Sequence, residues 1–152
     1  MSRRQARELA FLVLFQVDLG RVPWEEALKR ILAENEELSA DARGFLAELV
    51  QGAQEHRTEI DRVLTHYSVE WPLVRMASTD RNILRLAVYE LLYRSDIPVE
   101  VTVNEAVELA KRYGEDDSGK FVNGVLGTII NEFRNLAGVQ TTAGAGPEDE
   151  ES

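Results

Sequence analysis

The sequence contains no cysteine among its 152 residues. This absence excludes disulfides and metal sites built on thiolates, and it fits a reducing cytoplasm. Only two histidines are present, His56 and His66. We interpret them as packing or surface residues, because two histidines without a further ligand do not make a metal site. The sequence therefore predicts neither a metal site nor a cofactor.

Long apolar runs are also missing. No segment approaches the roughly 18 uninterrupted apolar residues that a membrane helix needs, so we expect no membrane association. The N-terminal stretch MSRRQARELAFLVLFQ has the arginines and the apolar residues of a secretory signal. However, Glu8 and Gln16 interrupt it, and no cleavage motif of small residues follows. We expect this stretch to form the first helix of the folded domain.

Basic residues are scarce in comparison with acidic ones. The chain has 17 Lys and Arg against 27 Asp and Glu, which gives a net charge of −10. Such a field repels phosphate and argues against a protein that coats nucleic acid generally. Yet Arg3, Arg4 and Arg7 fall within an arc of about 100° on a helix, at about 100° per residue. The pattern predicts one exposed cationic face on an acidic body, which suits a local and assisted contact with RNA.

No strand pattern competes with the helical periods of this sequence. Apolar residues make up 44% and charged residues 29% of the chain, as in an ordinary soluble domain. We therefore predict an all-α domain of about seven helices over residues 1–138. Trp71-Pro72 breaks the pattern and predicts a hinge between two packed sub-bundles, about 1–68 and 71–138. Residues 139–152 are expected to form an acidic, disordered tail.

The helical periods also predict where the elements begin and end. The expected helices are 3–18, 24–32, 40–67, a short turn at 73–76, 78–92, 102–113 and 117–136. Thr102 and Glu105 have the spacing of a capping box. Gly114 is expected to end its helix in the left-handed conformation. Gly124 and Gly127 cost helix stability, so we expect close backbone packing at both.

The stretch GEDDSGKFVNG, residues 114–124, has most of the spacing of a phosphate-binding loop. Such a loop follows a strand and carries a hydroxyl after its lysine. Here a helical segment precedes it, and Phe121 occupies the hydroxyl position, so we reject nucleotide binding. The stretch is better explained as a helix–helix connection, which places Lys120 and Phe121 in the first turn of the last helix. Phe121 is then either a core residue or a platform for an unstacked base.

Paired acids in the same connection raise the question of catalysis. Asp116 and Asp117 are adjacent, but neither a nucleophile nor a positioned base accompanies them in the sequence. A helix N-terminus explains both residues without chemistry. The sequence therefore predicts that the protein is not an enzyme and has no catalytic residues.

Three segments resemble the NusB family of bacterial transcription antitermination factors. They are RRQARELAFLVLFQ, DRNILRLAVYELLYRSDIPVEVTVNEAVELAKRYG and SGKFVNGVLG. The resemblance covers about residues 3–133. It implies an all-helical, non-enzymatic RNA-binding protein of the cytoplasm. It also implies pairing with the ribosomal protein NusE and binding to the single-stranded boxA element of nascent ribosomal RNA. There the pair would help to load an antitermination complex on RNA polymerase.

The resemblance also implies two sets of site residues. The expected RNA contacts are Arg3, Arg4, Arg7, Lys120 and Phe121. Gln5 stands where the family often has another basic residue, so this patch is expected to be weaker here. The expected NusE contacts are Asp80, Leu84, Arg85 and Val88.

Two other functions remain open at this stage. The chain could be a homodimeric protein-interaction module that does not bind RNA as a free protein. It could also be an accessory domain, because NusB-like domains occur fused to RNA cytosine methyltransferases. No methyltransferase sequence follows here, which makes the accessory role the weaker alternative.

Overall fold

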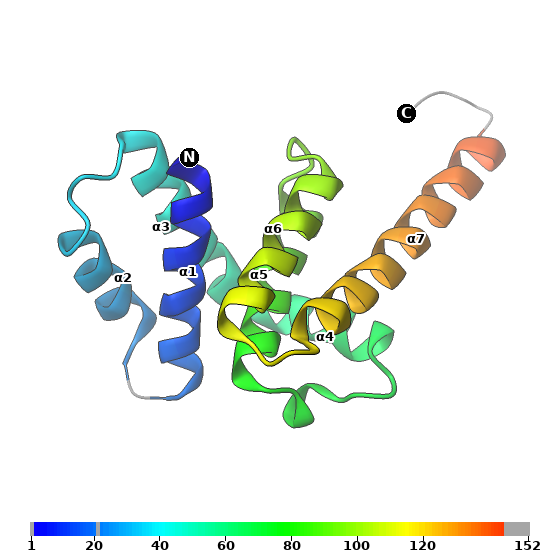
Figure 1. Ribbon diagram of the computed structural model, residues 1–152. Coiled ribbons are helices and arrows are strands. Elements are labelled where there is room, and N and C mark those ends of the chain that lie inside the picture. Colours follow the sequence, from blue (N-terminus) through cyan, green and yellow to red (C-terminus); the bar gives the residue numbers. More distant parts are fainter. Residues whose placement is uncertain (1, 21, 145–152) are drawn as a thin grey trace.

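Seven α-helices and one short 3₁₀-helix make up the protein in the computed structural model, which describes residues 2–20 and 22–144 (Figure 1). No strand occurs within that part of the chain, as the sequence predicts. The elements are α1 (Ser2–Asp18), α2 (Trp24–Ala33), α3 (Ala40–Glu55), α4 (Arg57–Tyr67), η1 (Leu73–Arg75), α5 (Ser78–Tyr93), α6 (Val99–Tyr113) and α7 (Ser118–Gly144). None of the described helices is long and apolar enough to cross a membrane.

Helix α5 is the centre of the molecule. It contacts α1, α3, α4, α6 and α7, and every residue from Asn82 to Glu90 is buried. A helix surrounded in this way must be apolar on all sides or pair its polar groups internally. The polar residues of α5 do pair: Arg85 with Asp61 of α4, and Glu90 with Arg7 of α1. Helix α5 therefore fixes the relative positions of the helices around it.

Helices α3 and α4 replace the single long helix expected over 40–67. The break is at His56, whose backbone (φ −106°, ψ 18°) leaves the helical range. It lets α4 pack against α5, η1 and α7 as well as α3. The His56 ring stacks on Tyr93 of α5, with 4.1 Å between the ring centroids. Sequence periodicity carries across the break because both helices bury an apolar face.

The predicted capping box at the start of α6 is wrong. The helix begins at Val99, directly after Pro98. Residues 99–103 therefore belong to the first turns of α6. Thr102 instead donates its hydroxyl to Glu90 of α5, and Glu105 accepts hydrogen bonds from Arg4 of α1. Both side chains serve contacts between helices, which local spacing cannot reveal.

The glycines of the last two helices also differ from expectation. Gly114 is extended (φ −97°, ψ −167°) rather than left-handed. Its requirement for glycine is steric, because an added Cβ would lie 2.4 Å from Oγ of Ser118. An added Cβ on Gly124 or Gly127 meets no described atom within 4 Å. The close packing expected at these two positions is therefore absent.

Helix α7 is longer than predicted. It continues past Leu136 to Gly144, so residues 139–144 of the expected tail are helical. The remaining tail residues, 145–152, lie outside the described part of the chain.

Candidate nucleic-acid interface

The start of α1 carries the three arginines that the sequence singles out, and each has a carboxylate partner. Arg3 lies 3.5 Å from Asp41 of α3 and 4.4 Å above the ring of Phe45. Arg4 makes a two-pronged contact with Glu105 of α6, at 3.1 and 3.0 Å. The hydrogen bonds to Glu105 raise the pKa of Arg4, and the carboxylate charge adds to the shift. Both guanidinium groups remain accessible to solvent.

Arg7 does not share the exposed face predicted for it. It is only 6% exposed, and two hydrogen bonds of 2.9 Å join its guanidinium to Glu90. Glu90 also accepts the hydroxyl of Thr102. Arg7 lies on the same side of α1 as Arg3 and Arg4, as the helical angle predicts, but Glu90 of α5 and Thr102 of α6 cover that part of α1. Arg7 therefore joins α1 to α5 and, through Glu90 and Thr102, to α6, and its guanidinium is committed to Glu90 inside the protein.

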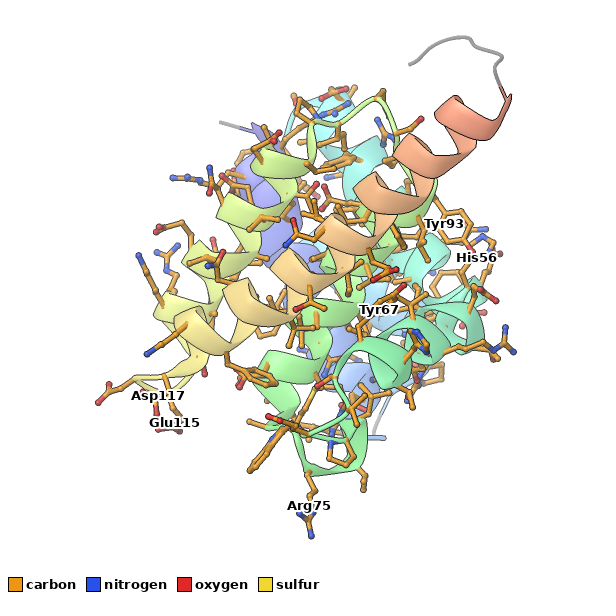
Figure 2. All side chains as sticks on the ribbon, turned by 90° about the vertical axis from the view of Figure 1, so that its right-hand side faces the viewer. His56, Tyr67, Arg75, Tyr93, Glu115 and Asp117 are labelled. Carbon is orange, nitrogen blue, oxygen red and sulfur yellow. The ribbon has the colours of Figure 1, made fainter. Side chains whose placement is uncertain are left out.

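The start of α7 follows the tight connection at Gly114. Oγ of Ser118 accepts a 2.9 Å hydrogen bond from the backbone N–H of Glu115, and Ser118 itself is buried. Lys120 is exposed in the first turn. Figure 2 shows Glu115 and Asp117 projecting from this connection. The helix–helix connection predicted from the sequence is thus confirmed, and no phosphate-binding loop is present among the described residues.

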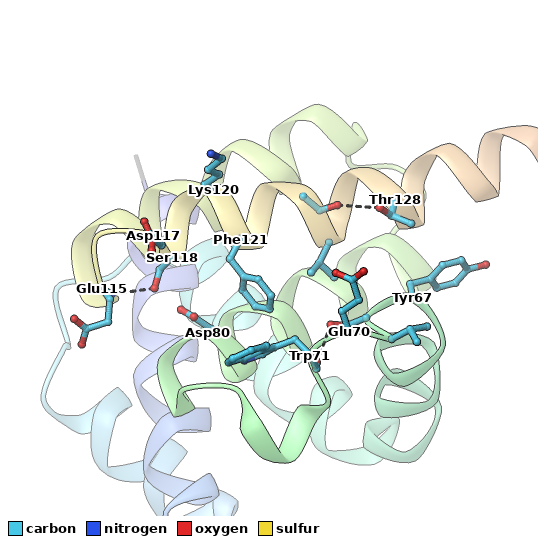
Figure 3. Close-up of a pocket in the computed structure, with 14 residues that line it drawn as sticks. Tyr67, Glu70, Trp71, Asp80, Glu115, Asp117, Ser118, Lys120, Phe121 and Thr128 are labelled. Carbon is cyan, nitrogen blue, oxygen red and sulfur yellow. Dashed lines mark hydrogen bonds between the residues drawn. The ribbon is translucent and has the colours of Figure 1, made fainter.

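Lys120 and Phe121 point to different sides of α7 (Figure 3). The Lys120 amine points away from the groove drawn there, whereas the Phe121 ring points into it toward Trp71. Phe121 is partly buried and packs against the core. Phe121 therefore contributes to the core, as one of the two alternatives predicts, and its ring also lines the groove.

The groove beside Phe121 has a volume of about 680 Å³. Its walls come from the loop after α4, the start of α5 and the first turns of α7, and four of its lining residues are carboxylates: Glu70, Asp80, Glu115 and Asp117. Oδ1 of Asp80 is buried without a hydrogen-bond partner among the described residues. Trp71 forms the opposite wall. The groove thus joins aromatic surface with an excess of negative charge.

Three of the four expected NusE contacts are inside the protein. Leu84 and Val88 are 0% exposed, and Arg85 is 8% exposed and pairs with Asp61 and Asp18. They face the helices that surround α5 and offer no surface to a partner. Asp80 differs, because it lines the groove.

The sequence did not identify the most exposed large apolar residues of the described chain as surface residues, and two of them, Val69 and Trp71, line the groove. Val69, Trp71 and Val74 are 78%, 49% and 85% exposed. The sequence did contain an indication of their exposure. Val69 and Val74 flank Trp71-Pro72, where the helical period stops, so the pattern assigns none of these residues to the buried face of a helix. The sequence also contained no sign of Glu105 or Glu90 as partners of the arginines.

Helix α6 connects the two predicted clusters. It contacts both α1 and α7, and Figure 1 shows it between them. Arg4 of α1 reaches Glu105 of α6. Near the other end of α6, Lys111 lies against Gly119, directly before Lys120. Arg4 and Lys120 therefore border the same helix, although 116 positions separate them in the sequence.

Comparison with known proteins supports the sequence resemblance. The NusB family model matches residues 4–131. The transcription antitermination protein NusB of Desulforamulus reducens is 49% identical over 139 residues, which are 91% of this chain and 96% of that protein. The solved structure of T. maritima NusB has a TM-score of 0.80 at 44% identity, covering 86% of this chain and 91% of that one.

A further solved structure contains the antitermination factors NusB and NusE in complex with dsRNA. The matched chain has a TM-score of 0.79 at 34% identity, covering 86% of this chain and 97% of that one. Together with the family match over residues 4–131 and the relative's identity over most of both chains, this likeness establishes the relationship. The chain belongs to the NusB family.

Proposed function

We propose that this protein is an RNA-binding transcription antitermination factor that acts with a NusE-type ribosomal protein. Its RNA is the boxA element of nascent ribosomal RNA, which locates the protein in the cytoplasm with RNA polymerase. The observation that supports this most is the placement of Arg4 and Lys120 along α6. One short RNA segment can contact both helix starts there.

The charges of the interface indicate weak binding by the protein alone. Arg3 and Arg4 are exposed but each faces a carboxylate, and Arg7 is enclosed. Arg3, Arg4 and Lys120 by themselves would contribute about −2 to the salt slope on single-stranded RNA, since each phosphate contact contributes about −0.7. The net charge of −10 opposes even this binding. A basic partner on the same RNA would supply the missing attraction.

The groove side of the molecule is suited to that partner. Val69 and Trp71 give the groove an exposed apolar patch, Val74 is exposed three residues further along the chain, and the groove also carries four carboxylates. Apolar surface gives affinity, while negative charge favours a basic protein and disfavours RNA phosphate. We therefore assign the partner to this patch and the RNA to the edge formed by α1, α6 and α7.

Titration of fluorescent boxA RNA across salt concentrations tests the RNA assignment. We expect Arg4→Gln and Lys120→Gln each to weaken binding and to make the salt slope shallower by about 0.7. Arg7→Lys should lower stability through loss of the two-pronged contact, but leave the salt slope of the folded protein unchanged. A duplex of the same sequence should bind less tightly than the single strand. Equal binding by wild type and both glutamine variants would reject the assignment.

A separate measurement tests the partner surface. Trp71→Ala should weaken binding of the NusE-type protein at least tenfold, because truncating a hot-spot aromatic residue often costs about 2 kcal/mol or more, and a tenfold change is about 1.4 kcal/mol. Leu19→Ala is a matched control, since Leu19 is exposed to nearly the same extent (48%). Sedimentation of the protein alone over a concentration range would show self-association through the same patch. A homodimer that Trp71→Ala disrupts, with no binding to the ribosomal protein, would support the protein-interaction alternative.

A further inference from the structure

Two exposed cations near the end of α6, Lys111 and Arg112, lie between the RNA contacts proposed above. We propose that both bind RNA phosphates, so that Arg4, Arg112, Lys111 and Lys120 form one continuous strip. This inference rests on the proposed function and extends its binding site. We call these four residues the α6 strip.

Arg112 lies on the side of the α6 strip that borders α1. Its Nη1 is 3.2 Å from Oε2 of Glu8, which is one helical turn after Arg4. A hollow of about 310 Å³ is lined by Arg4, Arg112 and Lys111 together. The three cations therefore surround one depression between α1 and α6, into which an RNA backbone can settle.

Lys111 continues the strip to α7. A Cβ added to Gly119 would lie 3.2 Å from Cγ of Lys111. The Lys111 stem thus rests on the first turn of α7, at the residue before Lys120. Along α6, Lys111 is six residues from Glu105, the partner of Arg4, or about 9 Å at 1.5 Å per residue. Without Lys111 and Arg112, this stretch between the two helix starts would carry no cation from α6.

Both side chains are available to a ligand. Lys111 is 65% and Arg112 67% exposed, and their contacts to Glu108 (3.8 Å) and Glu8 are surface ion pairs. Exposed pairs of this kind contribute little net stability, so a phosphate can compete with the carboxylate. Glu8, Glu105 and Glu108 also line the hollow. These acids lower the RNA affinity of the α6 strip, and they favour a path of the RNA backbone that stays close to the four cations.

Lys111→Gln, Arg112→Gln and the double variant test this inference in the boxA RNA titration. Each single change should weaken binding about fivefold at about 0.1 M salt and make the salt slope shallower by about 0.7, as expected for one phosphate contact on a single strand. In the double variant, RNA affinity should fall about 25-fold and the salt slope should be shallower by about 1.4. Unfolding temperatures should stay close to wild type, because both residues are exposed.

Arg30→Gln is the matched control. Arg30 is an exposed, ion-paired arginine on α2, and α2 is not among the main contacts of α6 or α7. The control should bind like wild type although its net charge changes equally. If the double variant binds with the affinity and salt slope of wild type, the inference is wrong and the proposed function still stands. The same conclusion follows if Arg30→Gln loses as much affinity as the strip variants. If wild type binds no boxA RNA, with or without the NusE-type protein, both proposals are wrong.

Discussion

The three arginines at the start of α1 differ in function because different groups lie against each one. Arg3 covers an aromatic ring, Arg4 meets Glu105 at the surface, and Arg7 meets Glu90 inside the protein. A buried pair loses several kcal/mol when one partner is removed, whereas an exposed pair contributes at most about 1 kcal/mol. Arg4 can therefore exchange its carboxylate for a phosphate, and Arg7 cannot.

The exchange at Arg4 leads to a prediction about Glu105. Glu105→Gln removes the carboxylate that occupies the guanidinium and one negative charge from the RNA path. We expect RNA affinity to rise about fivefold, which corresponds to about 1 kcal/mol for an exposed pair. Fluorescence anisotropy with labelled boxA RNA measures this change. Glu59→Gln, an equal charge change at an exposed pair on α4, should leave the affinity as it is. Unaltered or weaker binding by Glu105→Gln would show that the pair does not compete with RNA.

At the scale of the element, α7 contains glycines that its packing does not require. Because an added Cβ on Gly124 or Gly127 meets no described atom within 4 Å, alanine at either position should raise the free energy of unfolding by up to about 1 kcal/mol. Gly52→Ala should have the opposite effect, since its Cβ would lie 2.3 Å from Cε1 of Tyr89. Urea denaturation of the three variants tests this contrast. Destabilisation by all three would mean that α7 needs its glycines after all.

Helix types and most helix positions could be predicted from this sequence, because each helix buries an apolar face with its own period. The break at His56 could not, since the period continues through it. The capping box failed for a related reason: Thr102 and Glu105 have the right spacing, but their tertiary partners determine where they point. Local patterns identify an element, while its partners decide the use of its polar residues.

The candidate site was predictable in part for the same reason. Arg4 and Lys120 could be identified from charge at helix starts and from the family resemblance. That Leu84 and Val88 offer no surface to a partner could not be predicted, because the polar residues of α5 pair with other helices inside the protein and leave this helix covered on its polar side as well. Lys111 and Arg112 looked like ordinary cations near a helix end until α6 was placed between α1 and α7.

At the scale of the whole molecule, an ion-pair network joins the two halves of the chain. Asp18 at the end of α1 pairs with Arg81 at 2.7 Å and Arg85 at 3.4 Å, both from α5. Burial raises the pKa of Asp18, but hydrogen bonds from Arg81 and Asn82 and the nearby arginine charges outweigh it and bring that pKa below its ordinary value. The folded protein therefore holds Asp18 ionised more strongly than the unfolded chain does.

This network predicts how stability responds to acid. A carboxyl whose pKa is lower in the folded state stabilises the protein fully above its unfolded pKa of about 3.9, and the contribution is lost as pH falls through the folded pKa. Asp18→Asn should lower the free energy of unfolding by about 3 kcal/mol at pH 7, because it removes the carboxylate of the largely buried Arg81 and one of the two carboxylates that pair with Arg85. The deficit should narrow below about pH 4. Urea denaturation at pH 7 and pH 3 measures both effects, with Glu59→Gln as an exposed control. A deficit of equal size at both pH values would contradict this account of Asp18.

We expect RNA to lie along one edge of an acidic molecule, over the starts of α1 and α7 and the second half of α6. Backbone amide shifts recorded while boxA RNA is added would map this edge. The shifted residues should cluster around Arg4, Lys111, Arg112 and Lys120, with α2 unaffected. Shifts concentrated on α2 and α3, with the end of α6 unchanged, would contradict this expectation.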